Sequence, residues 1–270
     1  MISIIIFSKD RAMQLELCLR SIYAHIVPAP KIYVLYRDTT PDFTTGYTKT
    51  RALYPDVLWV RESNFHTNFY DICHQIQTPY FLGLTDDDVV IRPPNLEKLL
   101  PAYSDDVATI SLRINPKINY CHPAKLELIT PEFESIMPIL RWRWTKCDAR
   151  GEWGYPHPIN AHVYKMSYFN HLLVNAIFST PNELEAWLNH HRDLTKPYLI
   201  ADTKTSILNI PNNLTQTGYT PHNNQEKNST FALNTLFLRG YKINTDNLYN
   251  IHPTQAHAEI PYSYIGGPHD

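Results

Sequence analysis

Runs of hydrophobic residues alternate with helical patterns along the first half of the chain. Apolar runs at residues 2–7, 31–36, 57–60 and 80–84 predict strands, and the continuous run at 2–7 is typical of a strand buried on both faces. Between them, apolar side chains recur at helical spacing, first in a helix that Asp10 is expected to cap and then in a second helix that ends before a Thr-Pro pair. This order predicts an α/β fold with a mostly parallel sheet and helices on both sides.

The pattern is less regular after residue 100. Residues 107–112 predict a strand, and residues 141–146 predict a strand or an irregular apolar arm. A Thr-Pro-Asn-Glu sequence at residues 180–183 is typical of a helix start, and residues 229–239 predict a last helix stopped by a glycine. Residues 212–228 are rich in Asn, Thr and Gln and predict a loop. Because no linker interrupts the chain, we expect one domain.

Composition and charge narrow the class of protein. Hydrophobic residues make up 43% of the 270 residues and charged residues 19%, as in folded globular proteins. Lys and Arg total 24 against 26 Asp and Glu, so no basic surface argues for a nucleic-acid partner. The four cysteines form no Cys-x-x-Cys pair, which disfavours a disulfide framework or a structural zinc site.

The apolar segments are too short for a membrane span, which needs about 20 apolar residues. The N-terminal run leads directly into Ser8 and lacks the pattern of a signal peptide. We therefore expect a cytoplasmic protein, with peripheral association at a membrane remaining compatible with the sequence.

Three adjacent aspartates, Asp86, Asp87 and Asp88, follow the apolar run at 80–84. On an extended chain Asp86 and Asp88 would face one ligand while Asp87 faces away. Three neighbouring carboxylates repel one another, and a cation would relieve that repulsion. Mg²⁺ or Mn²⁺ suits such oxygen ligands and commonly joins one or two carboxylates to substrate phosphates. The alternative is an acidic surface turn, but the apolar Val-Val-Ile sequence that follows disfavours it.

The carboxyl ends of parallel strands meet at one edge of a sheet, where ligands bind. Ser8, Arg37 and Asp86 each lie at such an end, so we expect three loops to converge on one site.

The Ile-Ile-Ile-Phe-Ser-Lys-Asp-Arg sequence, the β-α-β-α-β order and the Asp-x-Asp element together resemble GT-A glycosyltransferases of the family 2 type. The resemblance covers residues 1 to about 100 and extends only loosely beyond. It implies a nucleotide-sugar-binding half at residues 1–115 merged with an acceptor-binding half at 116–270. It also implies a UDP- or GDP-linked donor, a divalent metal, and a glycan acceptor, most simply a cell-surface polysaccharide.

The resemblance also implies roles for individual residues. Asp88 would bind the metal, and Asp86 would contact the ribose or reach the metal through water. The other side chains implied to lie against the nucleotide-sugar are Phe7, Ser8, Arg11, Tyr36, Arg37 and Asp87. For Tyr36, packing in the core is an equal alternative to stacking on the base.

Residues 150–158 combine aromatic rings with an acid, as sugar-binding sites do. An inverting transferase needs a carboxylate that deprotonates the acceptor hydroxyl. Glu152 is the first candidate for this base and Asp148 the second, with Trp153 and Tyr155 on the acceptor side. The alternative is an aromatic loop that only fills the core.

A second polar segment follows this loop. Related enzymes often carry an Asp-Gly-His-like stretch where this chain has Asn160-Ala161-His162, so a catalytic role at residue 160 is in doubt, while His162 is a candidate acceptor contact. By the same resemblance, His252 or His257 could supply a late metal ligand.

Two other functions compete with glycosyl transfer. An Asp-x-Asp element after a strand also occurs in haloacid-dehalogenase-type phosphatases, where the first Asp is the nucleophile. Those enzymes usually carry it on the first strand, unlike this chain. A non-catalytic sugar-binding relative of a glycosyltransferase would keep the aromatic loop but bind no nucleotide.

Overall fold

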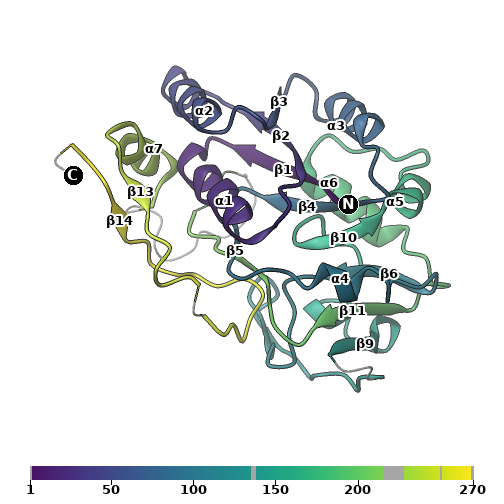
Figure 1. The fold of residues 1–270 in the computed structure, drawn as a ribbon. Coiled ribbons are helices and arrows are strands. Elements are labelled where there is room, and N and C mark those ends of the chain that lie inside the picture. Colours follow the sequence, from purple (N-terminus) through teal and green to yellow (C-terminus); the bar gives the residue numbers. More distant parts are fainter. Residues whose placement is uncertain (1, 135–137, 214, 216–227, 250, 269–270) are drawn as a thin grey trace.

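The computed structural model describes residues 2–134, 138–213, 215, 228–249 and 251–268. Strands from both parts of the chain form one eight-stranded sheet (Figure 1). From edge to edge its strands are β3 (Leu58–Arg61), β2 (Lys31–Arg37), β1 (Ile2–Lys9), β4 (Tyr80–Thr85), β10 (His162–Lys165), β6 (Val107–Ser111), β11 (Tyr198–Asp202) and β9 (Ile139–Arg143). The first four are parallel, β10 runs antiparallel to β4 and β6, and β9 runs antiparallel to β11.

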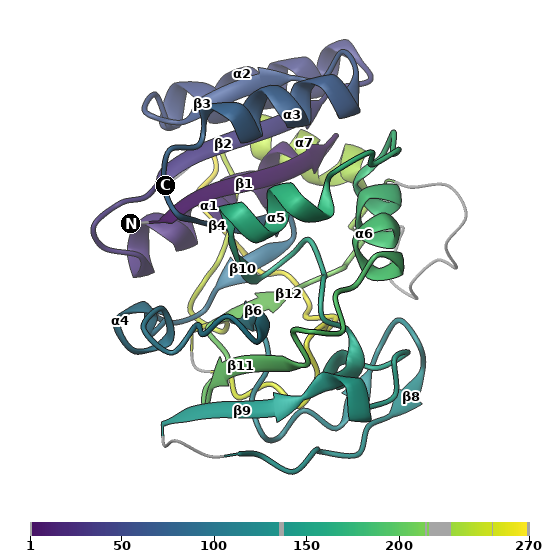
Figure 2. The same ribbon diagram turned by 90° about the vertical axis from the view of Figure 1, so that its right-hand side faces the viewer.

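Helices cover both faces of the sheet, as predicted (Figures 1 and 2). One face carries α1 (Ala12–His25), α2 (Pro41–Leu53), α4 (Leu96–Leu99) and α7 (Thr230–Leu238), and the other carries α3 (Phe65–Gln75), α5 (Met166–Leu172) and α6 (Pro181–His190). The shorter elements are the strand pairs β5 (Asp88–Val90) with β12 (Ile207–Asn209), β7 (Tyr120–Cys121) with β8 (Leu126–Glu127), and β13 (Lys242–Ile243) with β14 (Tyr264–Ile265), and the 3₁₀ helices η1 (Trp144–Lys146) and η2 (Glu152–Gly154).

Strand β1 shows why a strand at the centre of this sheet is a continuous apolar run. Ile4 and Ile6 enter the core beneath α1, whereas Ile5 and Phe7 enter the core beneath α3. Successive side chains of a strand point to opposite faces, so a strand covered on both sides must be apolar throughout. The predicted strands at 2–7, 31–36, 80–84 and 107–112 are confirmed in this way.

The start of the first helix differs from the prediction. Asp10 has φ 56° and does not cap α1; its carboxylate instead accepts hydrogen bonds from the Thr39 backbone N–H and hydroxyl, both at 2.8 Å. Asp10 therefore ties the end of β1 to the chain after β2. Arg11 occupies the N-cap position without a side-chain cap bond.

Helix α2 was not predicted from the sequence. This helix begins after Thr40, whose side chain accepts a hydrogen bond from the Phe43 N–H, and Pro41 occupies its first turn. Only a few of its residues are buried, so its apolar periodicity is weak.

The later elements follow the pattern more closely. Helices α6 and α7 confirm the predicted starts, with Thr180 and Ser229 as the capping residues. Residues 141–146 form the end of β9 and then η1. Of the loop predicted at residues 212–228, residues 214 and 216–227 lie outside the described part of the chain.

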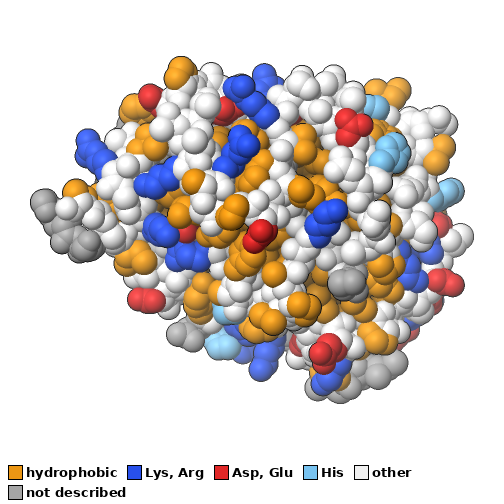
Figure 3. Space-filling view, turned by 45° about the horizontal axis from the view of Figure 1, so that its top comes forward, with side chains coloured by type: hydrophobic (Ala, Val, Ile, Leu, Met, Phe, Trp, Pro, Cys, Tyr) orange, Lys and Arg blue, Asp and Glu red, His pale blue; other side chains and the backbone are white. Residues whose placement is uncertain are grey.

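The side chains on one face of the molecule are mixed in type, and the cysteines are unpaired. On the face shown in Figure 3, Lys and Arg side chains are interspersed with hydrophobic and acidic ones. All four cysteines are free thiols. Within the described residues, no helix combines the length and the apolar character that crossing a membrane requires.

Gly83 on β4 gives a test of the sheet's centre. A Cβ at this position would lie 2.0 Å from the backbone oxygen of Ile159, which cannot move without shifting the segment before β10. We expect Gly83→Ala to lower the free energy of unfolding by roughly 3 kcal/mol, as overpacked cores do. Gly46→Ala is the comparison: its new Cβ would lie 2.1 Å from Asn234 Oδ1 and 3.0 Å from the Ala12 Cβ, so a side chain must shift but no backbone atom stands in the way. Alanine also favours the helix, so we expect a smaller loss. Equal losses in urea unfolding of the two variants would contradict this account.

Candidate active site

The three aspartates lie at the turn that joins β4 to β5. All are buried, with 3%, 8% and 1% of Asp86, Asp87 and Asp88 exposed. Asp86 and Asp87 form the turn itself, and Asp88 is the first residue of β5. The expectation that an extended chain would turn Asp87 away is therefore wrong, because the turn brings all three side chains into the interior.

One side of this acid turn faces the end of β1. The Asp86 carboxylate accepts hydrogen bonds from the Ser8 hydroxyl at 2.8 Å and from the Lys9 backbone N–H at 3.2 Å. Arg11 Nη1 lies 2.8 Å from Asp86 and 3.0 Å from Asp87, and its other terminal nitrogen donates to the backbone oxygen of Asn213. The positive charge at this side of the turn is thus the Arg11 guanidinium, at a helix start where a cation would otherwise be disfavoured.

The other side faces the second part of the chain. Asp88 Oδ2 accepts from the Thr85 N–H and hydroxyl, at 2.7 and 3.0 Å. Asn209 Nδ2 lies 2.9 Å from both Asp87 Oδ1 and Asp88 Oδ1. Asn160 Nδ2 lies 3.4 Å from Asp88 Oδ1. The carboxylates are therefore surrounded by neutral donors on this side.

A ring of side chains connects Asp88 to Glu152. Asn160 accepts a 2.7 Å hydrogen bond from Arg113, whose Nη2 lies 2.7 Å from Glu152 Oε2. His257 Nε2 lies 3.4 Å from Glu152 Oε1, and His257 Nδ1 lies 3.0 Å from the Asn209 Oδ1 that faces away from Asp88. The ring is closed, so the acid turn and Glu152 belong to one hydrogen-bonded cluster.

The two ends of this ring have opposite electrostatics. Burial, reinforced by Asp87, raises the pKa of Asp88 to about 6, and burial raises that of Asp86 to about 6 against the attraction of Arg11. Burial also opposes ionisation of Glu152, but Arg113 and His257 outweigh it and hold its pKa below the usual range. Glu152 is thus firmly ionised, whereas Asp86 and Asp88 sit close to their titration range.

The other residues predicted on the nucleotide side divide into buried and exposed ones. The Phe7 ring packs against Phe65 and Phe69, so only its backbone oxygen meets the acid turn, through the Asp86 N–H at 3.1 Å. Tyr36 is buried against Tyr47, with ring centroids 4.7 Å apart. Arg37 is exposed and pairs with a surface glutamate.

On the predicted acceptor side, the Trp153 indole is buried and packs edge-on against Trp142 at 5.2 Å. The Tyr155 hydroxyl donates to Glu185 at 3.0 Å. His162 is fully buried, its Nδ1 lies 2.9 Å from the Thr109 hydroxyl, and its pKa is lowered by burial and by Arg113. His162 is therefore neutral at pH 7.

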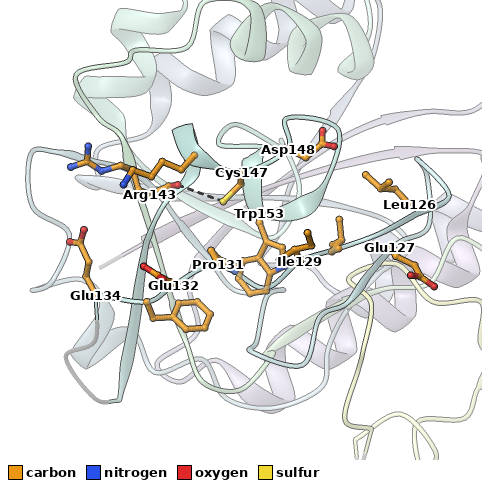
Figure 4. A pocket seen from close by; sticks show the side chains of 13 residues that line it. Leu126, Glu127, Ile129, Pro131, Glu132, Glu134, Arg143, Cys147, Asp148 and Trp153 are labelled. Carbon is orange, nitrogen blue, oxygen red and sulfur yellow. Dashed lines mark hydrogen bonds between the residues drawn. The ribbon is translucent and has the colours of Figure 1, made fainter.

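Asp148 and His252 lie apart from the ring. Asp148 is exposed and pairs with Arg150 at 2.6 Å, and His252 is exposed as well. Asp148 instead lines a cavity of about 610 Å³, whose walls come from residues 126–134 and 143–148 with Trp153. In Figure 4 the Trp153 ring lies at the centre of this lining, with Glu134 and Arg143 at one end and Leu126 and Glu127 at the other. The three aspartates and Glu152 do not line it.

Sequence reasoning missed two members of the ring, Arg113 and Asn209. Arg113 directly follows the apolar run at 107–112, so the argument applied to other strand ends would have found it. Asn209 is one of several asparagines in its region, and its importance depends on the pairing of β12 with β5.

The side chains around the acid turn include ligand types that suit a divalent metal. Among the described residues, no group of three or more His, Cys, Asp or Glu side chains is placed to hold a metal ion. However, Asp88 and His257 contact the two ends of one Asn209 amide, and Asp87 and Asp86 adjoin Asp88. Such a donor set fits a cation whose remaining ligands come from substrate phosphates, the usual mode for Mg²⁺, and does not fit a cage made of protein ligands alone.

Comparison with known proteins supports a glycosyltransferase-like chain. No protein-family profile matches. The chain is 22% identical over 182 residues to "Bifunctional glycosyltransferase pgtA" of Dictyostelium discoideum, and the match covers 61% of this chain. It spans only about a quarter (24%) of that relative's length.

Solved structures give the same indication for the fold. S. aureus TarS aligns with a TM-score of 0.51 at 11% identity, over 78% of this chain and 37% of the TarS chain. A shorter TarS structure in complex with UDP aligns with a TM-score of 0.47 at 12% identity, over 76% of this chain and 59% of that one. The predicted α/β class and the predicted resemblance to GT-A glycosyltransferases are confirmed.

The raised pKa of Asp88 predicts a pH-dependent cost to stability. Between its ordinary pKa of 3.8 and its folded value of about 6, the folded protein binds more protons than the unfolded chain, so stability falls as pH rises through this window. In a chelator, the stability of Asp88→Asn relative to the native protein should therefore rise by about 2 kcal/mol between pH 4.5 and pH 7.5. The Asn side chain also places an NH₂ group against the donors that surround Asp88, but this cost is the same at both pH values.

Thermal unfolding at both pH values measures this difference. Asp148→Asn, at an exposed site, is the control and should show no such rise between the two pH values. If the stability of Asp88→Asn relative to the native protein is the same at both pH values, ionisation of Asp88 has no part in it.

Proposed function

We propose that this protein is a metal-dependent glycosyltransferase, which moves a sugar from a UDP- or GDP-linked donor to a hydroxyl group of a glycan. The observation that carries the proposal is the buried acid turn at the carboxyl end of β4, hydrogen-bonded through one ring to a second, firmly ionised carboxylate. The GT-A-like fold and the similarity to a curated glycosyltransferase support it. We further propose that the glycan acceptor is a cell-surface polysaccharide.

We assign the donor side to the end of β1 and the acid turn. Asp88 with Asp86 would hold Mn²⁺ or Mg²⁺, with His257 as the nearby candidate for a further ligand and the exposed His252 as a more remote one. When bound, the cation would stabilise the charge that develops on the leaving nucleoside diphosphate. Ser8, Arg11 and Asp87 would orient the nucleotide-sugar, with Arg11 offsetting one of the three negative charges of the unliganded turn.

The roles proposed for the other predicted donor contacts, Phe7, Tyr36 and Arg37, depend on where their side chains lie. Phe7 would contribute through its backbone, and Tyr36 through the ring packing that shapes the wall beside Tyr47. Arg37 lies beyond this wall on the surface, where only an extended donor would reach it.

On the acceptor side, we propose Glu152 as the general base. Its contacts with Arg113 and His257 keep it ionised but also weaken it as a base, because a general base works best with a pKa near the working pH. Glu152 must therefore exchange one of these contacts for the acceptor hydroxyl before it can take the proton. Asp148 is the second candidate, and His162 would hold the wall beneath Glu152.

The cavity beside Trp153 is the proposed entry for the acceptor. Its lining combines apolar and aromatic groups with four carboxylates and two cations, from Glu127, Glu132, Glu134, Asp148, Arg143 and Lys146. Two of these carboxylates, Glu134 and Asp148, pair with Arg141 and Arg150, so the cavity offers a diphosphate no surplus of positive charge. Its aromatic surface suits the faces of sugar rings. Tyr155 would support this side through its bond to Glu185.

Nucleotide binding gives the first test. UDP or GDP with Mn²⁺ should raise the melting temperature by roughly 5 °C at saturating ligand, because ligand that binds only the folded state stabilises it. Asp88→Ala should lose this rise. A native protein that does not respond to either nucleotide with Mn²⁺ would favour the phosphatase or the sugar-binding alternative.

The base assignment needs a second comparison. Glu152→Gln should reduce sugar transfer about 10²–10⁴-fold, the usual contribution of a general base, while the affinity for the nucleotide stays unchanged. Asp148→Asn should transfer at nearly the native rate. The opposite result, with full loss in Asp148→Asn and full activity in Glu152→Gln, would move the base to Asp148.

A further inference from the structure

Asn209 occupies a central position in the ring. It is the last residue of β12, its Cα pairs with that of Asp88 on β5, and 5% of the residue is exposed. Its backbone N–H donates to Ala256, and its backbone oxygen accepts from the Ala258 N–H at 2.9 Å. The C-terminal segment that carries His257 is thus bound alongside Asn209.

The Asn209 side chain uses both ends of its amide. Nδ2 donates to Asp87 and Asp88, each at 2.9 Å, and Oδ1 lies 3.0 Å from His257 Nδ1. Carboxylates accept and do not donate, so the NH₂ group must face the aspartates, and the oxygen is left for the His257 N–H. Aspartate could keep only the contact to His257, and an aliphatic side chain would keep neither.

The pairing of the strands does not depend on this side chain. Backbone hydrogen bonds from Ile210 N–H to Asp87, from Ile91 N–H to Ser206 and from Ala258 N–H to Asn209 already hold the three segments together. The amide instead fixes the directions of two carboxylates and one imidazole. The imidazole Nε2 in turn lies 3.4 Å from Glu152 Oε1 and 3.4 Å from Nη1 of Arg113, the guanidinium that pairs with Glu152.

We infer that Asn209 is a positioning residue: its amide holds Asp88 on the donor side and, through His257, Glu152 on the acceptor side in one relative arrangement. This inference rests on the proposed function. It implies that the loss of one buried amide far along the chain should weaken binding of the metal–nucleotide complex as well as transfer, beyond any effect on folding.

The experiment compares Asn209→Ala with Asn234→Ala. Asn234 is a control of the same type, since it is 3% exposed and its amide donates to the Asp42 backbone oxygen, away from the ring. Mn²⁺–UDP and Mn²⁺–GDP are titrated into each protein by calorimetry, and melting temperatures are recorded alongside. We expect Asn209→Ala to weaken the affinity for the bound nucleotide at least tenfold and to lower kcat for transfer, while Asn234→Ala keeps native values of both.

Asn209→Asp is the second variant and keeps the acceptor for His257. It places a fourth carboxylate against Asp87 and Asp88, so its melting temperature in EDTA should fall and should recover with millimolar Mn²⁺ by several degrees more than that of the native protein. The inference is overturned if Asn209→Ala binds the Mn²⁺–nucleotide complex as tightly as Asn234→Ala does. If Asn209→Ala does not fold, the inference is overturned when the melting temperature of Asn209→Asp responds to Mn²⁺ as that of the native protein does. If the native protein itself binds neither nucleotide, the proposed function fails and the inference fails with it.

Discussion

The burial of three consecutive carboxylates at the β4–β5 turn is the constraint that the rest of the site depends on. A buried charge is costly unless it is paired and hydrogen-bonded. This protein meets the requirement with one cation, Arg11, and with hydroxyl, amide and backbone donors from Ser8, Thr85 and Asn209. Part of the cost remains, because burial still raises the pKa of both Asp86 and Asp88.

The carboxylates of this cluster differ in whether a positively charged side chain contacts them. Arg11 reaches Asp86 and Asp87 but not Asp88 in the contacts described, whereas Arg113 and His257 both reach Glu152. Asp88 thus has no cation among its described contacts, whereas Glu152 is paired with the Arg113 guanidinium. Pairs of acids whose pKa values are pushed apart are a common basis for distinct roles in catalysis. In the proposed transferase, Asp88 is ready to gain a cation and Glu152 is held ionised near the acceptor.

The topology of the sheet brings these groups together. Strand β10 is inserted antiparallel between β4 and β6, and hydrogen bonds from Ala161 to Gly83 and from Leu112 to Ala161 join the three strands at one end. Asn160 and Arg113, next to these joints, therefore lie beside the acid turn. The close approach of the Ile159 backbone to Gly83 is part of the same arrangement.

The amino-acid sequence by itself determined the parallel half of the sheet and the place of the acid turn after β4, because a strand buried on both faces requires a continuous apolar run. Local composition also marked Glu152 as a candidate. Only the tertiary structure decided that Asp87 turns inward, that Asp148 pairs at the surface, and that Asn209 and Arg113 complete the ring. These features depend on hydrogen bonds between residues far apart in the chain. A local pattern of hydrophobic and polar positions cannot predict such bonds.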